Sequence, residues 1–327
     1  MKKYQSILGV YDTQKGIEKL RNNFQDNLAE ALDLTRVSAP LFLFAETGLN
    51  DNLNGTEEAV NFSVLGKRAE VVHSLAKWKR YALKKYDFFV HKGIYTDMNA
   101  IRKDEAPDSI HSYYVDQWDW EYIINEDERT DETLEAVVRK IFNVLLKTEG
   151  FICNKYTDIP RVLPKEIYFI TSQELEDLYP NLSPKCREDE ICKKHGAVFL
   201  KQIGKTLKSG TRHDGRSPDY DDWNLNGDLL VWYDVLGMAL ELSSMGIRID
   251  RESLLKQSQE AGTEDRLTLP YHRMVLNSEI PFTIGGGIGQ SRLCMFLLKK
   301  AHIGEVQVSL WPDEMRAACL EDGIKLL

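Results

Sequence analysis

The segment Gly285-Gly-Gly-Ile-Gly-Gln290 continues directly into Ser291-Arg292-Leu293 and an apolar stretch. Clustered glycines let a backbone approach a ligand closely, and an arginine at the start of a helix suits a phosphate or a base face. The spacing Gly287-x-Gly289 resembles the first half of a dinucleotide-binding fingerprint, but Arg292 occupies the position of the third glycine. The segment therefore predicts a nucleotide site in a fold other than the dinucleotide-binding one.

Length and composition narrow the class of protein. The 327 residues, 43% hydrophobic and 28% charged, suit one large globular domain or two ordinary ones. The formal net charge of -9 argues against a broad nucleic-acid-binding face, because phosphate backbones are held by basic surfaces. We find neither a signal peptide nor a membrane-spanning segment, and the five cysteines lack paired spacing. We therefore expect a cytoplasmic protein with reduced thiols and with no nucleic-acid or membrane partner.

Helices and strands follow one another without a regular βαβ rhythm, which predicts an α+β fold. Pro40 indicates an edge or distorted strand in 37–44, and the polar stretch 205–224 is typical of a functional loop. Apolar patterns predict the other elements. We expect helices over 13–34, 131–147, 251–261, 264–278 and 291–300, and strands over 165–170, 196–203 and 305–311, with an apolar run over 228–233.

One aromatic segment alternates in a way that indicates a strand used for recognition. In a strand, Gln117, Asp119 and Glu121 would share one face, while Trp118 and Trp120 would fill the other. Polar side chains that converge from one strand favour ligand binding over a place in the core.

Several blocks together resemble the catalytic core of class II aminoacyl-tRNA synthetases, above all those for aspartate and asparagine. The shared features are Arg102 with Glu105, Gln117-x-Asp119-x-Glu121, Glu241 and Gly287-Ile-Gly-Gln-Ser-Arg292. Six longer blocks, in the right order and over essentially the whole chain, are similar to the ammonia-dependent asparagine synthetases, the aspartate–ammonia ligases. These blocks are Asp51–Gly55, Val71–Arg80, Tyr114–Glu121, Ser217–Trp223, Glu241–Arg248 and Thr283–Arg292.

This resemblance implies a fold and a reaction. The fold would be one catalytic domain over 1–327, with a mainly antiparallel sheet flanked by helices and no anticodon-binding domain. Pro40, after a long helix, is similar to the first class II motif, which implies a homodimer. The reaction would be ATP-dependent synthesis of L-asparagine from L-aspartate and ammonia through β-aspartyl-AMP, with release of AMP and diphosphate.

The resemblance also assigns residues to ATP. Arg102 would contact the α-phosphate and the attacking carboxylate, and Arg292 would stack on adenine and reach the γ-phosphate. The other face of adenine would meet Tyr113 or Val115. The full set expected at ATP is Arg102, Tyr113, Glu241, Gly289 and Arg292, with Mg²⁺ on Glu241 and on Asp228 or Asp234.

A second set is implied for aspartate. It consists of Asp51, Lys79, Gln117, Asp119, Arg216, Asp221 and Ser244. Asp221 would take part in catalysis with Arg102 and Arg292, either by orienting or deprotonating ammonium, or it would only bind substrate. Two other functions stay open at this point: a ligase that acts on tRNA or a carrier, and a paralogue kept as a regulator.

Overall fold

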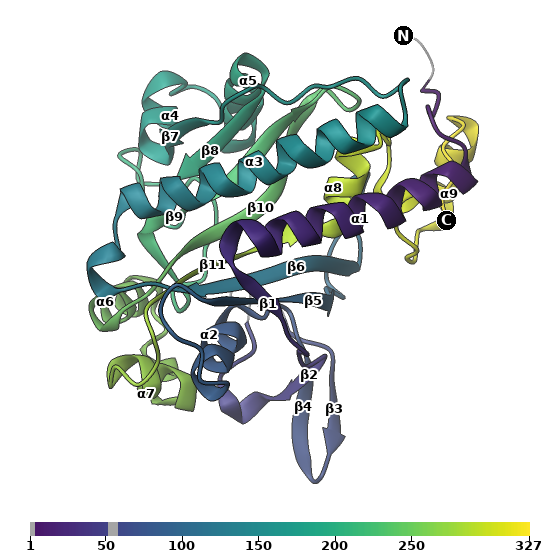
Figure 1. Ribbon diagram of the computed structural model, residues 1–327. Coiled ribbons are helices and arrows are strands. Elements are labelled where there is room, and N and C mark those ends of the chain that lie inside the picture. The colour runs from purple at the N-terminus through teal and green to yellow at the C-terminus, as the bar shows by residue number, and fades with distance from the viewer. Residues whose placement is uncertain (1–3, 52–57) are drawn as a thin grey trace.

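The computed structural model describes residues 4–51 and 58–327, so positions 52–55 of the block that begins at Asp51 lie outside the described residues. An eight-stranded sheet of order β1-β5-β6-β11-β10-β9-β8-β7 forms its centre (Figure 1). The outermost pairs β1–β5 and β7–β8 are parallel, and the pairs between them are antiparallel. The strands are β1 (Leu34–Arg36), β5 (Gly93–Ile101), β6 (Tyr114–Ile123), β7 (Tyr168–Thr171), β8 (Ala197–Lys201), β9 (Asp221–Tyr233), β10 (Met238–Arg248) and β11 (Thr283–Gly289).

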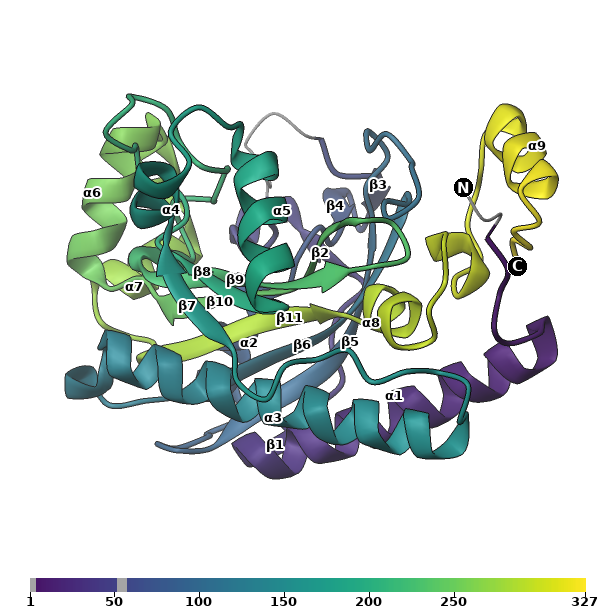
Figure 2. The same cartoon turned by 90° about the horizontal axis from the view of Figure 1, so that it is seen from above.

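Helices cover both faces of this sheet, which confirms the predicted α+β class. The long helices α1 (Val10–Leu32) and α3 (Asp131–Lys155) lie side by side on one face, and α5 (Pro184–His195) and α6 (Arg251–Ala261) lie on the other (Figure 2). Helix α1 buries Leu20, Phe24, Leu28 and Leu32 at helical spacing, and the Phe24 ring lies 4.7 Å from that of Trp118. The other helices are α2 (Ala76–Lys85), α4 (Ser172–Leu178), α7 (Pro270–Leu276), α8 (Gln290–Leu297) and α9 (Asp313–Glu321).

A small second sheet of order β2-β4-β3 projects from the main body (Figure 1). Its strands are β2 (Phe42–Phe44), β3 (Asn61–Val64) and β4 (Lys67–Val71). The segment 37–44, predicted as one distorted strand, is instead the connection from β1 into β2. Pro40 lies in that connection, where its missing N–H costs no ladder hydrogen bond. Within 4–51 and 58–327, we find no helix with the length and apolar character that crossing a membrane requires.

Two further predictions from the sequence differ from the structure: one strand is absent, and one strand begins earlier, inside a predicted loop. The segment 305–311 is not a strand: the short 3-10 helix η4 (Ile303–Glu305) precedes an extended stretch whose Val308 and Leu310 are 71% and 77% exposed. In the part of the chain that the structure describes, this stretch pairs with neither sheet. Strand β9 begins at Asp221, inside the predicted loop 205–224, because Asp221 pairs with Arg248 of β10.

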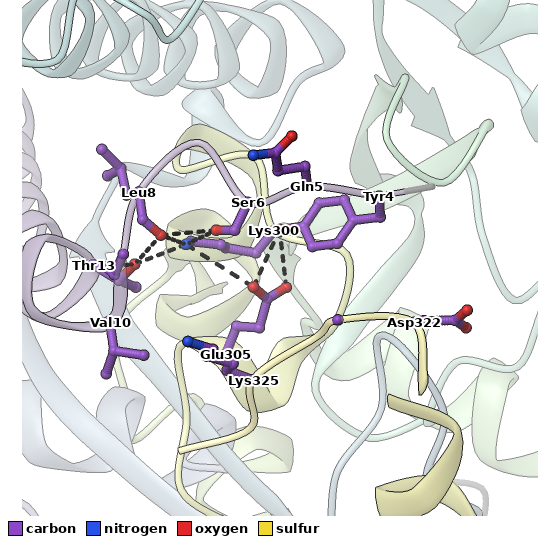
Figure 3. Close-up of a pocket in the computed structure, with 12 residues that line it drawn as sticks. Tyr4, Gln5, Ser6, Leu8, Val10, Thr13, Lys300, Glu305, Asp322 and Lys325 are labelled. Carbon is purple, nitrogen blue, oxygen red and sulfur yellow. Dashed lines mark hydrogen bonds and ion pairs between the residues drawn. The ribbon is translucent and has the colours of Figure 1, made fainter. Parts of the chain in front are cut away.

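The beginning and end of the described chain meet at a cavity of about 460 Å³ (Figure 3). The buried Lys300 ammonium donates hydrogen bonds to Ser6 Oγ at 2.6 Å and Thr13 Oγ1 at 2.7 Å. The Tyr4 hydroxyl donates to Glu305 Oε1 at 3.1 Å. These contacts fix the start of α1 against the segment that follows α8.

The cysteines give a test of this packing. All five are free, as predicted, and Cys186 is exposed while Cys192 and Cys294 are buried. Burial raises the pKa of Cys294 to about 12 and also raises that of Cys192. Because the thiolate is the reactive form, we expect a disulfide reagent such as DTNB to modify Cys186 first in the native protein. Cys192 and Cys294 should react only in guanidinium, as measured by peptide mass, and equal native rates for the three would contradict this packing.

Candidate active site

Strand β6 carries the polar row that the sequence predicted. Trp118 and Trp120 are fully buried, and Trp118 packs against α1, while Gln117 and Asp119 face the opposite side. Two adjoining cavities of about 200 and 220 Å³ open on that side. Both are lined by the same four residues, which are Arg102, Gln117, Glu241 and Gly287. The site is therefore one continuous space with two parts.

The glycine-rich strand β11 lies under this space, between β6 and β10. Gly287 pairs with Asp119 of β6 and with Ser244 of β10. A Cβ atom at Gly287 would lie 2.5 Å from Gln117 Oε1 and 2.7 Å from Asp119 Oδ1. Only a glycine lets both side chains extend across this strand toward the cavities.

The first cavity contains the residues predicted for ATP, except one. Arg102, Glu241, Gly289 and Arg292 line it, together with Val115. Tyr113 is not among its lining residues; its carbonyl accepts a hydrogen bond from the Arg102 backbone N–H at 2.9 Å. Of the two candidates for the second face of adenine, the geometry therefore favours Val115.

The side chain of Arg292 comes from the first turn of α8, and a carboxylate from β6 fixes that turn. Asp116 accepts hydrogen bonds from Ser291 N at 3.1 Å and Ser291 Oγ at 2.8 Å. Gly289, at the N-cap, provides no side chain for this purpose. The Arg292 guanidinium then donates to the Glu241 carbonyl at 3.2 Å and lies 3.6 Å from its carboxylate.

The second cavity brings together every residue predicted for aspartate. Those residues are Asp51, Lys79, Gln117, Asp119, Arg216, Asp221 and Ser244. Lys79 is 1% exposed, and its ammonium donates to the Gly286 carbonyl at 2.8 Å and pairs with Asp119 Oδ1 at 3.2 Å. Burial lowers the pKa of Lys79, and Asp119 opposes that effect. Within the described residues, the buried Asp119 Oδ2 has no hydrogen-bond partner, so one carboxylate oxygen is left for a ligand.

Arginines neutralise three further carboxylates in or beside this cavity, which are Asp221, Asp228 and Glu121. Arg216 pairs with Asp228 at 2.5 Å and hydrogen-bonds Ser244. Arg248 bonds Asp221 and donates to Glu121 Oε2 at 2.7 Å. The pKa of Glu121, which burial alone would raise, is lowered mainly by Arg248. These pairs offset the charges of Asp221, Asp228 and Glu121.

Sequence reasoning missed Arg248 and Tyr220, which also line the second cavity. Arg248 ends the block Glu241–Arg248 that resembles the family, so that block was the available signal. Strict strand alternation would place Glu241 and Ser244, three residues apart, on opposite faces. A register shift in β10 between Glu241 and Ser243 brings both toward the cavity.

The two predicted magnesium ligands lie on neighbouring strands at this space. Burial raises the pKa of Asp228 to about 6, with the charge of Glu241 adding to the rise and Arg216 opposing it. Asp234 lines neither cavity; its carboxylate is 54% exposed and pairs with Lys299 at 3.1 Å. Across 4–51 and 58–327 no group of three or more His, Cys, Asp or Glu residues could hold a metal ion. Asp228 and Glu241 both line the second cavity and supply carboxylate oxygens, the ligand type that Mg²⁺ prefers.

Known proteins are similar to this chain in fold and in sequence. Asparaginyl-tRNA synthetase from Pyrococcus horikoshii complexed with asparaginyl-adenylate superposes with a TM-score of 0.67 at 15% identity, over 93% of this chain and 70% of that chain. The asparaginyl-tRNA synthetase of Entamoeba histolytica gives 0.64 at 14% identity, over 90% of this chain and 67% of that chain. These likenesses confirm the class II synthetase fold.

The sequence comparisons are more specific. The model of the family described as aspartate-ammonia ligase matches residues 11–323. The aspartate–ammonia ligase of Fusobacterium nucleatum is 58% identical over 325 residues, 99% of both chains. That of Ligilactobacillus salivarius is 57% identical over 330 residues, 100% of this chain and 98% of the relative. With this match over nearly its full length, the chain belongs to the aspartate–ammonia ligase family, enzymes that make asparagine from aspartate and ammonia.

Proposed function

We propose that the two cavities bind the substrates of one reaction, which proceeds in two steps. In the first step, the side-chain carboxylate of L-aspartate attacks the α-phosphorus of ATP, which forms β-aspartyl-AMP and releases diphosphate. In the second step, ammonia attacks the activated carbonyl carbon, and AMP leaves with the carboxylate oxygen. A carboxylate alone is a poor acyl donor because its oxygen leaves badly, and the mixed anhydride overcomes this.

The observation that carries the proposal is the position of Arg102. Its side chain lines both cavities, so one guanidinium group can contact the α-phosphate and the attacking carboxylate together. Within the described residues, its buried Nε has no hydrogen-bond partner, as expected of a donor kept for a ligand. Catalysis would then come from holding the two reactants in line and from stabilising the charge on phosphorus.

The first cavity would take ATP. Arg292, held at the first turn of α8, would stack on adenine and reach the γ-phosphate, with Val115 on the other face and Gly289 leaving room for the nucleotide. Glu241 and Asp228 would hold Mg²⁺, whose charge would neutralise the phosphates. Arg216 and Arg292, which neutralise these carboxylates in the structure, stand where the anionic groups of the substrates would bind.

The second cavity would take aspartate. The unpaired Asp119 Oδ2 would accept from the α-ammonium group, and Lys79 and Arg216 would bind carboxylates. Asp221 would orient incoming ammonia, the unprotonated species that attacks, by accepting a hydrogen bond from its N–H group. Its pairing with Arg248 favours that role over proton abstraction, because a carboxylate beside a guanidinium is a weaker base.

The resemblance to class II synthetases also supports a homodimer of single catalytic domains. Pro40 lies between α1 and β2, and the adjacent Leu41 and Phe42 are exposed apolar residues of the kind that an interface would cover. A location in the cytoplasm stays a prediction from the sequence.

The chemistry can be tested with labelled substrate. With ATP, MgCl₂, NH₄Cl and aspartate carrying ¹⁸O in the side-chain carboxylate, we expect equimolar asparagine, AMP and diphosphate, one ¹⁸O in AMP, and no activity in excess EDTA. Mass spectrometry of the nucleotides reads out the result. Production of ADP, or AMP without label, would overturn the adenylate route. A strict requirement for tRNA would overturn ammonia as the acceptor.

A further inference from the structure

One side of the second cavity is formed by a segment without regular secondary structure. Residues 202–220, between β8 and β9, contain no helix or strand and carry Arg216 and Tyr220 into the cavity just before Asp221. Its backbone is held only by scattered pairings in the described residues, such as the bridge between Thr206 and Arg212 and the hydrogen bond from Ile249 N to the Tyr220 carbonyl at 3.0 Å. Side-chain contacts must hold this segment, called the pocket loop below, if the cavity is to keep its shape.

Asp219 makes the most concentrated of those contacts. It is 1% exposed and accepts hydrogen bonds from Lys77 Nζ at 2.9 Å and Ser217 Oγ at 2.8 Å. Its Oδ2 also lies 2.8 Å from His272 Nε2 and 4.0 Å from Arg266 Nη1. Burial would raise its pKa, but Lys77 and His272 hold the pKa of Asp219 well below its usual range. A buried carboxylate with this many donors is firmly held in place.

None of the side chains in this cluster belongs to the site. Asp219, Lys77, His272 and Arg266 line neither cavity. Lys77 comes from α2, His272 from α7 and Arg266 from the 3-10 helix η3 (Glu264–Thr268). The carboxylate thus joins the pocket loop to three elements behind it, while its neighbour Tyr220 faces the cavity.

Helix α2 contributes to both the cluster and the cavity. Lys79 lines the cavity, whereas Lys77, two residues earlier, contacts Asp219. Residues two apart on a helix point to different sides, so one helix serves both directions. The pair Lys77–Asp219 consequently sets the separation between Lys79 on one side of the cavity and Arg216 on the other.

We propose that Asp219 is a positioning residue for the aspartate part of the site, an inference that rests on the proposed placing of aspartate in the second cavity. Through Lys77 and His272, Asp219 keeps Arg216, Tyr220 and Asp221 in register with Lys79. The residues that line the ATP cavity come from β6, β10, β11, α8 and the segments beside them, and none belongs to the pocket loop. Loss of the cluster should therefore weaken aspartate binding and leave ATP binding unchanged.

The test is Asp219→Asn, which keeps the size of the side chain and removes its charge. We expect the KM for aspartate to rise about 10- to 100-fold, because displacement of binding groups by about 1 Å has effects of this order. The KM for ATP should stay within about twofold. Lys77→Gln, which breaks the same pair from α2, should give the same selective rise and serves if Asp219→Asn does not fold.

Glu176→Gln is the matched control. Glu176 is also a buried acid; it pairs with Arg187 at 3.2 Å and touches the same pocket loop, but at Ser209, away from the cavity. The Glu176→Gln substitution should lower the thermal midpoint and leave the KM values for aspartate and ATP unchanged. An unchanged aspartate KM in Asp219→Asn or Lys77→Gln, equal rises for both substrates, or an equal rise in the control would overturn the inference. If the chemistry proposed above were wrong instead, the wild-type protein itself would fail the labelled-aspartate test.

Discussion

Replacement of Arg102 by methionine is expected to lower kcat for asparagine formation by about 10²- to 10³-fold, the usual effect of removing one donor aimed at developing charge. Arg102 is the charged donor shared by the two cavities, so its loss removes the contact between the α-phosphate and the attacking carboxylate. Arg102→Lys should recover only part of the loss, because an ammonium group cannot contact both oxygens as a planar guanidinium does.

The effect should appear in the first chemical step. Aspartate-dependent exchange of labelled diphosphate into ATP reports adenylation alone, and it should fall by the same factor as asparagine formation. Lys103→Met is the matched control, since the adjacent Lys103 is exposed and lines neither cavity. If Arg102→Met kept normal exchange and lost only the ammonia step, the assignment of Arg102 to the adenylation step would be wrong.

Replacement of Lys79 by methionine should have an effect on both binding and stability. The buried Asp119 would lose its cation, and the Gly286 carbonyl would lose its donor. Breaking one partner of a buried ion pair typically costs about 3–5 kcal/mol, so we expect a clearly lower thermal midpoint. Because Lys79 is a proposed carboxylate ligand, the KM for aspartate should rise above the highest aspartate concentration that the assay can use.

Titration of Lys79→Met with aspartate, at a temperature well below its thermal midpoint, measures the loss of binding separately from the loss of stability. Lys84→Met, on the same helix but exposed, should change neither the midpoint nor the KM by a measurable amount. Aspartate saturation of Lys79→Met at wild-type concentrations would contradict the binding role, whatever happened to the stability.

Local sequence patterns predicted those parts of the site that follow regular periodicity. The alternation of Trp118 and Trp120 with Gln117 and Asp119 was confirmed because β6 is a regular strand with one buried face. The apolar pattern over 13–34 likewise predicted a helix, and α1 spans Val10–Leu32. Such patterns depend on residues that are close in the sequence, so they can be recognised without knowledge of long-range contacts.

Other features depend on partners far away in the sequence. The register shift that turns Glu241 and Ser244 to the same side arises from the pairing of β10 with β9, which no local pattern reveals. The stretch that contains Val308 and Leu310 alternates like a strand but pairs with no strand in 4–51 and 58–327. The resemblance to a known family identified the predicted aspartate residues despite such irregularities. Members of a family share a fold, so matching motifs mark residues that lie together in it.

The place of β11 in the sheet has a consequence for how the protein is made. This strand, residues 283–289, separates β1-β5-β6 from β10-β9-β8-β7, and it is the last strand in the sequence. During translation both half-sheets emerge before it, each with an unpaired inner edge at β6 or β10. Unpaired edges of this kind invite association with other chains. Nascent chains that stop short of residue 283 should therefore depend on chaperones, and the glycine-rich strand that shapes the site also completes folding of the sheet.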